Sequence, residues 1–142
     1  MIHRKTFGAA LGNLDAMRVF MAEKLEECGA EKELIEAVVY SANEMTTNII
    51  EHGYEDEGAG EIEITVEKQD GQVVVRLRDH APPFDPTEMP DPDVSLPLEE
   101  RPLGGMGVYL TKKFLDDFSH RVLPEGGNEL VLIKRFAKGS AA

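Results

Sequence analysis

The sequence predicts an α+β fold in which helices cover one face of an antiparallel or mixed sheet, as a two-layer sandwich. Apolar residues recur every 3.6 positions near the N-terminus and every two positions in the middle of the chain, and both patterns return later. At 142 residues, the chain has the length of about one ordinary domain. We therefore expect one domain over residues 1–137 and a loose C-terminal tail over residues 138–142.

Two helices are expected in the first part of the chain. The first spans residues 14–28, with Asn13 as N-cap and Gly29 just past its end. The second runs from about residue 32 to residue 52 and ends at Gly53. Because each helix carries a single apolar stripe, the two should pack side by side.

The middle of the chain predicts a β-hairpin. Residues 61–67 and 72–78 alternate apolar and polar side chains, and Asp70 and Gly71 form the turn between them. Further strands are expected at residues 3–7, 119–123 and 129–136.

A proline-rich segment separates this hairpin from a third helix. Residues 80–103 hold seven of the eight prolines, which inside a compact domain is typical of a functional loop or lid. Three glycines then open a helix that we expect over residues 104–118. Its inward-facing residues are Val108, Thr111, Leu115 and Phe118.

Composition argues against several classes of protein. The formal net charge of −12 repels nucleic acid and anionic lipid, so neither is expected as a partner. The chain has no apolar run of about 18 residues and no signal-peptide pattern, so a cytoplasmic protein is expected. The single cysteine, Cys28, excludes an internal disulfide and is expected to be a small buried hydrophobe.

The second helix carries a polar pair beside its apolar stripe. Glu44 and Asn48 are four residues apart, so both side chains point the same way. A carboxylate can accept a proton, and an amide oxygen can bind Mg²⁺. Such a pair is also common on solvated helix faces, so by itself it indicates little.

Two further stretches suit a nucleotide. Asp79 ends a strand and precedes a tight turn at residues 81–83, where a carboxylate could accept a hydrogen bond from an exocyclic amine, or could simply start the turn. The glycines at residues 104–107 leave helix N–H groups free for phosphate oxygens, although glycines also cap and turn chains. They match neither a P-loop nor a Rossmann fingerprint.

The order of these stretches is informative. The chain resembles the GHKL ATP-binding fold, and within it the small anti-sigma factor and serine-protein kinase family of bacterial partner-switching systems. ANEMTTNIIEHGY resembles that family's N box, RDHAPPFDP its first glycine box, and GGMGVYLTKKFLDDFSH its second, while LPEGGNELVLIKRF resembles its closing hairpin.

This resemblance implies ATP and Mg²⁺ as cofactors. It implies that Asn48 holds Mg²⁺, that Glu44 is the general base for a substrate serine or threonine, and that Asp79 binds the adenine amine. The residues implied to line the phosphates are Gly104, Gly105, Met106 and Gly107.

Two positions depart from the family pattern. Ala81 stands where the family usually has glycine, and Asn128 stands where a threonine often supports the adenine, so phosphate binding is better supported than adenine binding. Arg101 either contacts a phosphate or partner or is simply exposed. The four histidines are expected to be surface or turn residues, namely His3, His52, His80 and His120.

Two functional hypotheses therefore stand beside a purely structural α+β domain. In the first, the chain is a kinase that phosphorylates a STAS-type anti-sigma-factor antagonist. In the second, it sequesters a sigma factor or another regulator, and the nucleotide is a structural ligand. The resemblance also leaves room for a homodimer.

Overall fold

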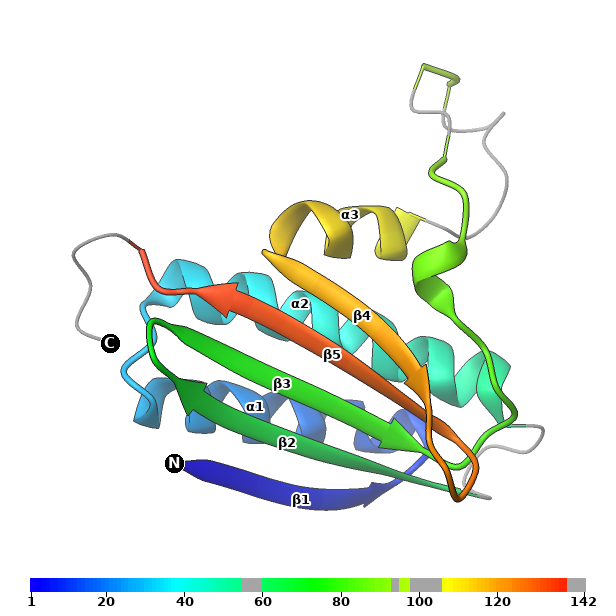
Figure 1. The fold of residues 1–142 in the computed structure, drawn as a ribbon, viewed down its shortest axis with the longest axis horizontal. Coiled ribbons are helices and arrows are strands. Elements are labelled where there is room, and N and C mark those ends of the chain that lie inside the picture. The colour runs from blue at the N-terminus through cyan, green and yellow to red at the C-terminus, as the bar shows by residue number, and fades with distance from the viewer. Residues whose placement is uncertain (55–59, 93–94, 98–105, 138–142) are drawn as a thin grey trace.

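The computed structural model describes residues 1–54, 60–92, 95–97 and 106–137. Its five-stranded sheet has the order β1-β2-β3-β5-β4, and every pairing is antiparallel (Figure 1). The strands are β1 (Ile2–Gly8), β2 (Glu61–Gln69), β3 (Gln72–Asp79), β4 (Asp117–Val122) and β5 (Asn128–Arg135). The predicted α+β sandwich is confirmed, while residues 138–142, expected as a tail, lie outside the described residues.

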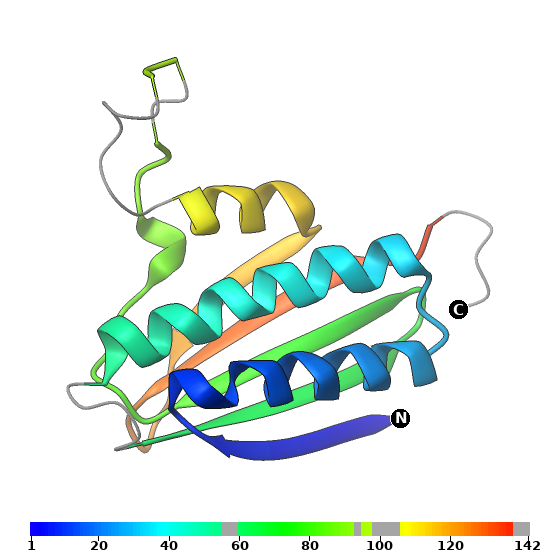
Figure 2. The same cartoon turned by 180° about the vertical axis from the view of Figure 1, so that it is seen from behind.

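Three helices lie on the same face of this sheet (Figure 2). They are α1 (Leu14–Glu27), α2 (Lys32–Asn48) and α3 (Met106–Phe114). Gly29 follows α1 with a φ of 84°, and Cys28 beside it is buried, both as predicted. Asn13 precedes α1, but its side chain forms no capping hydrogen bond, and its Nδ2 donates to the carbonyl oxygen of Gly8. In the described part of the chain, no helix is both long enough and apolar enough to cross a membrane.

The core lies between the sheet and the helices. On β2 and β3 the apolar side chains that face this layer alternate along each strand and are fully buried, including Ile62, Ile64, Val75 and Leu77. Burying each such side chain contributes about 1.5–3 kcal/mol. The opposite face of the sheet carries charged pairs instead, so the strands alternate as expected for an antiparallel sheet covered on one side.

The turn between β4 and β5 passes directly against the end of β3. Gly127 in this turn has a φ of 94°, and a Cβ atom there would lie 2.0 Å from the main-chain oxygen of Asp79. Only glycine permits this approach. The turn thereby places Asn128, the first residue of β5, opposite Asp79 in the strand register.

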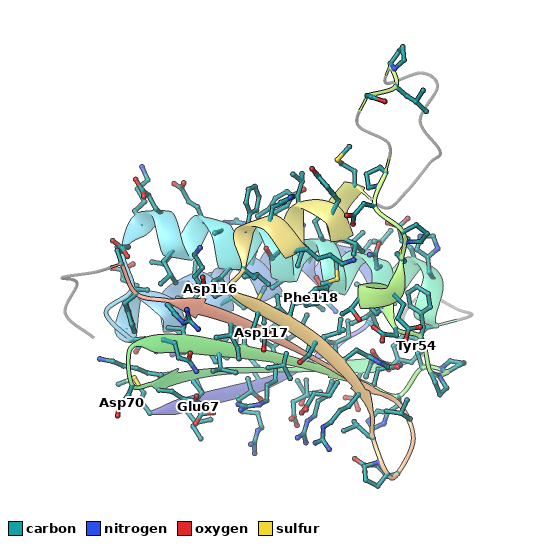
Figure 3. All side chains as sticks on the ribbon, turned by 45° about the horizontal axis from the view of Figure 1, so that its top comes forward. Tyr54, Glu67, Asp70, Asp116, Asp117 and Phe118 are labelled. Carbon is teal, nitrogen blue, oxygen red and sulfur yellow. The ribbon has the colours of Figure 1, made fainter. Side chains whose placement is uncertain are left out.

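The third helix is shorter than predicted. It ends at Phe114 instead of residue 118, because the chain there joins the sheet: the Asp116 N–H donates to the Ile133 carbonyl, and Asp117 pairs with the same residue (Figure 3). Phe118 is still partly buried against the core, but it reaches the core from β4. Its position in the helical period of the sequence was therefore misleading.

Candidate functional site

Two of the predicted site residues lie together at one end of the sheet, where β3 and α2 end and β5 begins. A small cavity there holds about 30 Å³ of space wide enough for water, and its lining includes Asn48, Gly53, Asp79, Ala81, Phe84 and Asn128. Tyr54, labelled in Figure 3, lies at this end of the molecule, and Asp70 of the β2–β3 turn lies at the other. The fold thus brings two predicted residues, Asn48 and Asp79, into one cavity.

Asp79 is a buried carboxylate in the wall of this cavity, with an exposed fraction of 2%. Its Oδ1 accepts hydrogen bonds from Asn128 Nδ2 and from the Ala81 N–H, both at 2.9 Å. Burial raises the pKa of this carboxyl, and these hydrogen bonds act against the rise by stabilising the anion. Asp79 is therefore a hydrogen-bond acceptor with a fixed position beside the cavity.

Asn128 connects Asp79 to the segment that follows β3. Its Nδ2 donates to the Asp79 carboxylate and lies 3.1 Å from the carbonyl oxygen of Pro82, while its Oδ1 accepts the Phe84 N–H at 3.0 Å. One amide thus contacts the Asp79 carboxylate and the main-chain groups of Pro82 and Phe84. The sequence showed Asn128 only as a departure from the family pattern. It did not predict these contacts.

His120 was predicted to be a surface or turn residue, and this prediction was wrong. Its side chain is only 6% exposed, and its Nε2 lies 2.7 Å from Asn128 Oδ1. The β4–β5 pairing places His120 opposite Leu130, two residues beyond Asn128 and on the same face of the sheet. The error arose because a histidine in a short strand gives no sequence signal of which face it occupies.

The end of α2 is shaped by a π-helical turn, Ile49–Gly53, that follows the α-helix as far as the predicted stop. The wider turn brings Gly53 against the wall of the cavity: a Cβ atom on Gly53 would lie 3.2 Å from that of Ala81. Tyr54 then joins two strands, because its hydroxyl donates to the Glu61 carbonyl at 2.7 Å and accepts the His80 N–H at 2.8 Å. Such single π turns often occur at functional sites.

Glu44 lies outside the cavity lining but against the beginning of α3. A Cβ atom on Gly107 would lie 2.3 Å from Glu44 Oε2, so the carboxylate occupies the space that this glycine leaves. Met106 is the first residue of α3 and is partly buried. Gly104, Gly105 and Arg101 lie outside the described residues, so their predicted contacts stay predictions.

The methyl group of Ala81 fits its position without backbone strain. Ala81 is 3% exposed, and no non-glycine residue among those described has a positive φ. Its main-chain N–H donates to Asp79, so the turn after β3 itself supports the carboxylate. The departure from glycine therefore narrows the cavity but leaves this part of its architecture intact.

The polar side chains at this end of the sheet suit a purine nucleotide with one bound Mg²⁺. Asp79 supplies an acceptor for an exocyclic amine, and Asn48 supplies an amide oxygen. The described residues contain no group of three His, Cys, Asp or Glu side chains able to hold a metal.

Comparison with known proteins identifies the family. Residues 7–134 match the family described as histidine kinase-like ATPase domain. The chain belongs to this family. The histidine kinase-like ATPase domain thus extends over nearly the whole sequence, from β1 to β5.

Several curated relatives of this ATPase domain are Bacillus proteins. The anti-sigma F factor of Bacillus licheniformis is 28% identical over 135 residues, which cover 95% of this chain and 92% of that protein. The anti-sigma F factor of Bacillus subtilis is 27% identical with the same coverage. The serine-protein kinase RsbW of Bacillus cereus is 26% identical over 122 residues, covering 83% of this chain and 74% of the relative.

A solved structure has the same fold as this ATPase domain. It contains the RsbU and RsbW domains of a Mycobacterium tuberculosis protein and superposes with a TM-score of 0.68 at 21% identity. The match covers 96% of this chain and 32% of that chain, so the present chain spans about a third of that protein's length. At this identity, the likeness shows the fold alone.

Proposed function

We propose that this protein is an ATP- and Mg²⁺-dependent serine/threonine protein kinase of the anti-sigma-factor type, acting on a STAS-type antagonist protein. One structural observation carries the proposal: Asn48 and Asp79 line one cavity, and Glu44 lies against the start of α3 at Gly107. The names of the relatives, anti-sigma F factor and serine-protein kinase RsbW, support the same conclusion.

Adenine recognition is assigned to Asp79. The amine of the base would donate to its carboxylate, whose position is fixed by hydrogen bonds from Ala81 and Asn128. The cavity of about 30 Å³ is much smaller than a typical ligand site of about 300–1,000 Å³. Entry of a purine therefore requires the wall at Pro82 and Phe84 to move outward.

Metal and phosphate binding are assigned to the neighbouring helix ends. Asn48 would offer its amide oxygen to Mg²⁺, and the glycine-rich start of α3 would offer main-chain N–H groups to the phosphates through Gly104, Gly105, Met106 and Gly107. When bound, Mg·ATP would supply the phosphoryl group, and its Mg²⁺ would neutralise part of the negative charge of the phosphates.

The role of general base is assigned to Glu44. Its carboxylate would accept the proton of the substrate serine or threonine hydroxyl while that oxygen is held near the start of α3. The close fit between Gly107 and Glu44 supports this role, because it holds the carboxylate where the phosphates would end. Phosphoryl transfer depends mainly on such positioning and on charge neutralisation.

The proposed partners are proteins of a partner-switching pathway in the cytoplasm. The substrate is a STAS-type antagonist, and the second partner is a sigma factor or a related regulator, as the names of the relatives suggest. A net charge of −12 favours a basic contact surface on either partner. Assembly as a homodimer remains part of this proposal.

The alternative function is a regulator-sequestering module with little or no kinase activity. It is favoured by the name of the first relatives, anti-sigma F factor, which describes binding instead of catalysis. In this case, the nucleotide would stabilise the binding-competent conformation by mass action.

The decisive experiment is incubation of the protein with labelled ATP, Mg²⁺ and a purified STAS-type antagonist. We expect label on a serine or threonine of the antagonist, and a loss of at least about 100-fold in the rate for Glu44→Gln with ATP affinity nearly unchanged. Glu36→Gln, an exposed residue on the same helix, is the matched control. Absence of label together with ATP-dependent partner binding would establish the alternative.

A further inference from the structure

The His120 side chain is buried beside the proposed adenine site, next to Asn128. Its ring is held between β4 and the segment after β3, and its exposed fraction is 6%. Nε2 lies 2.7 Å from Asn128 Oδ1, whereas Nδ1 faces the carboxylate of Asp85 at 3.8 Å, too far for a hydrogen bond. The ring therefore makes its short contact with the residue that supports Asp79.

The orientation of the Asn128 amide is determined by its other partners. Its NH₂ group faces the Asp79 carboxylate, and its oxygen faces the Phe84 N–H. Turning the amide over would place its oxygen against a carboxylate and its NH₂ against another N–H, so only the observed orientation satisfies both neighbours. The group that faces His120 is consequently a carbonyl oxygen, which can only accept.

It follows that His120 donates a proton from Nε2. In the neutral ring, the hydrogen must then reside on Nε2, with Nδ1 unprotonated. Protonation of the ring adds a hydrogen to Nδ1 but leaves the Nε2–H in place, so the contact with Asn128 persists in both states. The His120 donor thus adds a hydrogen bond that further stabilises the amide orientation in which Asn128 donates to Asp79.

From this chain of contacts we infer that His120 is a positioning residue for purine discrimination, acting through Asn128 on Asp79. The inference rests on the proposed nucleotide site. Adenine presents an amine donor where guanine presents a carbonyl acceptor, so a fixed carboxylate acceptor favours adenine. When the Asn128 donor turns away, the buried carboxyl is free to rotate or to bind a proton, and a protonated carboxyl donates to guanine.

Three variants separate this role from a structural one. His120→Leu fills a similar space without a donor, and His120→Gln places an amide N–H near the former Nε2. Ser119→Ala, at the exposed neighbouring position on the opposite face of β4, is the matched control. Calorimetric titrations with Mg·ATP and Mg·GTP give the affinity ratio for each variant, and thermal unfolding shows whether each variant is folded.

The ratio of ATP to GTP affinity is expected to fall about tenfold in His120→Leu, the usual effect of losing one buried hydrogen bond. His120→Gln should restore it to within about threefold of the wild-type value, since the lost hydrogen bond is replaced. The Ser119→Ala ratio should equal that of the wild type. The ¹⁵N spectrum of the His120 ring in the nucleotide-free protein at alkaline pH should show a protonated Nε2.

Two results would overturn the inference while leaving the proposed function in place. One is a folded His120→Leu variant with the wild-type ratio, and the other is a His120 ring protonated on Nδ1 with a bare Nε2. A wild-type protein that binds neither nucleotide overturns the proposed function, and this inference with it.

Discussion

Replacing Asp79 with asparagine should separate the stability of the fold from nucleotide binding. An asparagine oxygen can still accept the hydrogen bonds from Ala81 and Asn128, each 2.9 Å long in the native protein. The substitution removes a negative charge from a residue that is 2% exposed. Because burial raises the pKa of this carboxyl, its ionisation opposes folding, so Asp79→Asn should unfold at an equal or higher temperature than the wild type at neutral pH.

The pH dependence of stability gives the sign of this effect. A carboxyl whose pKa is higher in the folded state than in the unfolded state contributes stability below the unfolded pKa, and that contribution is lost as the pH rises through the folded pKa. The stability advantage of Asp79→Asn should therefore be smallest in acid, below an unfolded pKa of about 3.9, and grow as the pH increases. Urea denaturation at several pH values measures this difference.

Nucleotide binding should change in the opposite direction. A hydrogen bond to a charged acceptor contributes about 1.5–3 kcal/mol, which corresponds to about 10- to 150-fold in affinity. Since the amide oxygen is a weaker acceptor, Asp79→Asn should bind Mg·ATP at least about tenfold more weakly in calorimetry. Asp70→Asn, at an exposed turn, is the control. Wild-type ATP affinity in Asp79→Asn would refute the adenine assignment, and a stability difference independent of pH would refute the burial argument.

Three further predictions concern glycines and Asn48. Gly127→Ala should lower the free energy of unfolding by more than about 2 kcal/mol, because a positive φ and a main-chain clash combine at this position. Gly126 also has a positive φ but open space around it, so Gly126→Ala should lower the free energy of unfolding by only about 1–2 kcal/mol. Urea denaturation measures both values. Gly107→Ala should displace the Glu44 carboxylate and reduce the rate of phosphotransfer by at least about 100-fold. The variant should unfold at nearly the wild-type temperature. Full kinase activity of the variant would contradict the role of that carboxylate. Asn48→Ala should abolish the Mg²⁺ dependence of ATP binding, and an unaltered metal titration would remove the assignment.

Hydrophobic periodicity predicted most of the fold because the core lies on a single face of the sheet. The alternation in residues 61–67 and 72–78 fixed the hairpin, whose turn glycine, Gly71, has the expected positive φ of 72°. The end of α3 was mispredicted because Phe118 fits the helical period and also faces the core from β4. The spacing of apolar residues cannot distinguish helix from strand here, because the strand forms by pairing with a distant residue, Asp117 with Ile133.

The candidate site was only partly predictable for a similar reason. Glu44 and Asn48 share a helix face by simple geometry, and the placement of Asn48 in one cavity with Asp79 was expected only from the family resemblance. The contacts of Asn128 and His120 depend on the register between β4 and β5, which is set by a glycine turn and by the close packing of that turn against β3. Sequence spacing alone does not contain this information.

We propose that a nucleotide binds where β3, β5 and α2 meet the beginning of α3. It is tested most directly by an NMR titration with Mg²⁺ and a non-hydrolysable ATP analogue. We expect the largest chemical-shift changes at the side-chain amides of Asn48 and Asn128 and at the main-chain amides of Ala81 and Gly107. Largest changes at the β2–β3 turn or on the charged, helix-free face of the sheet would contradict it.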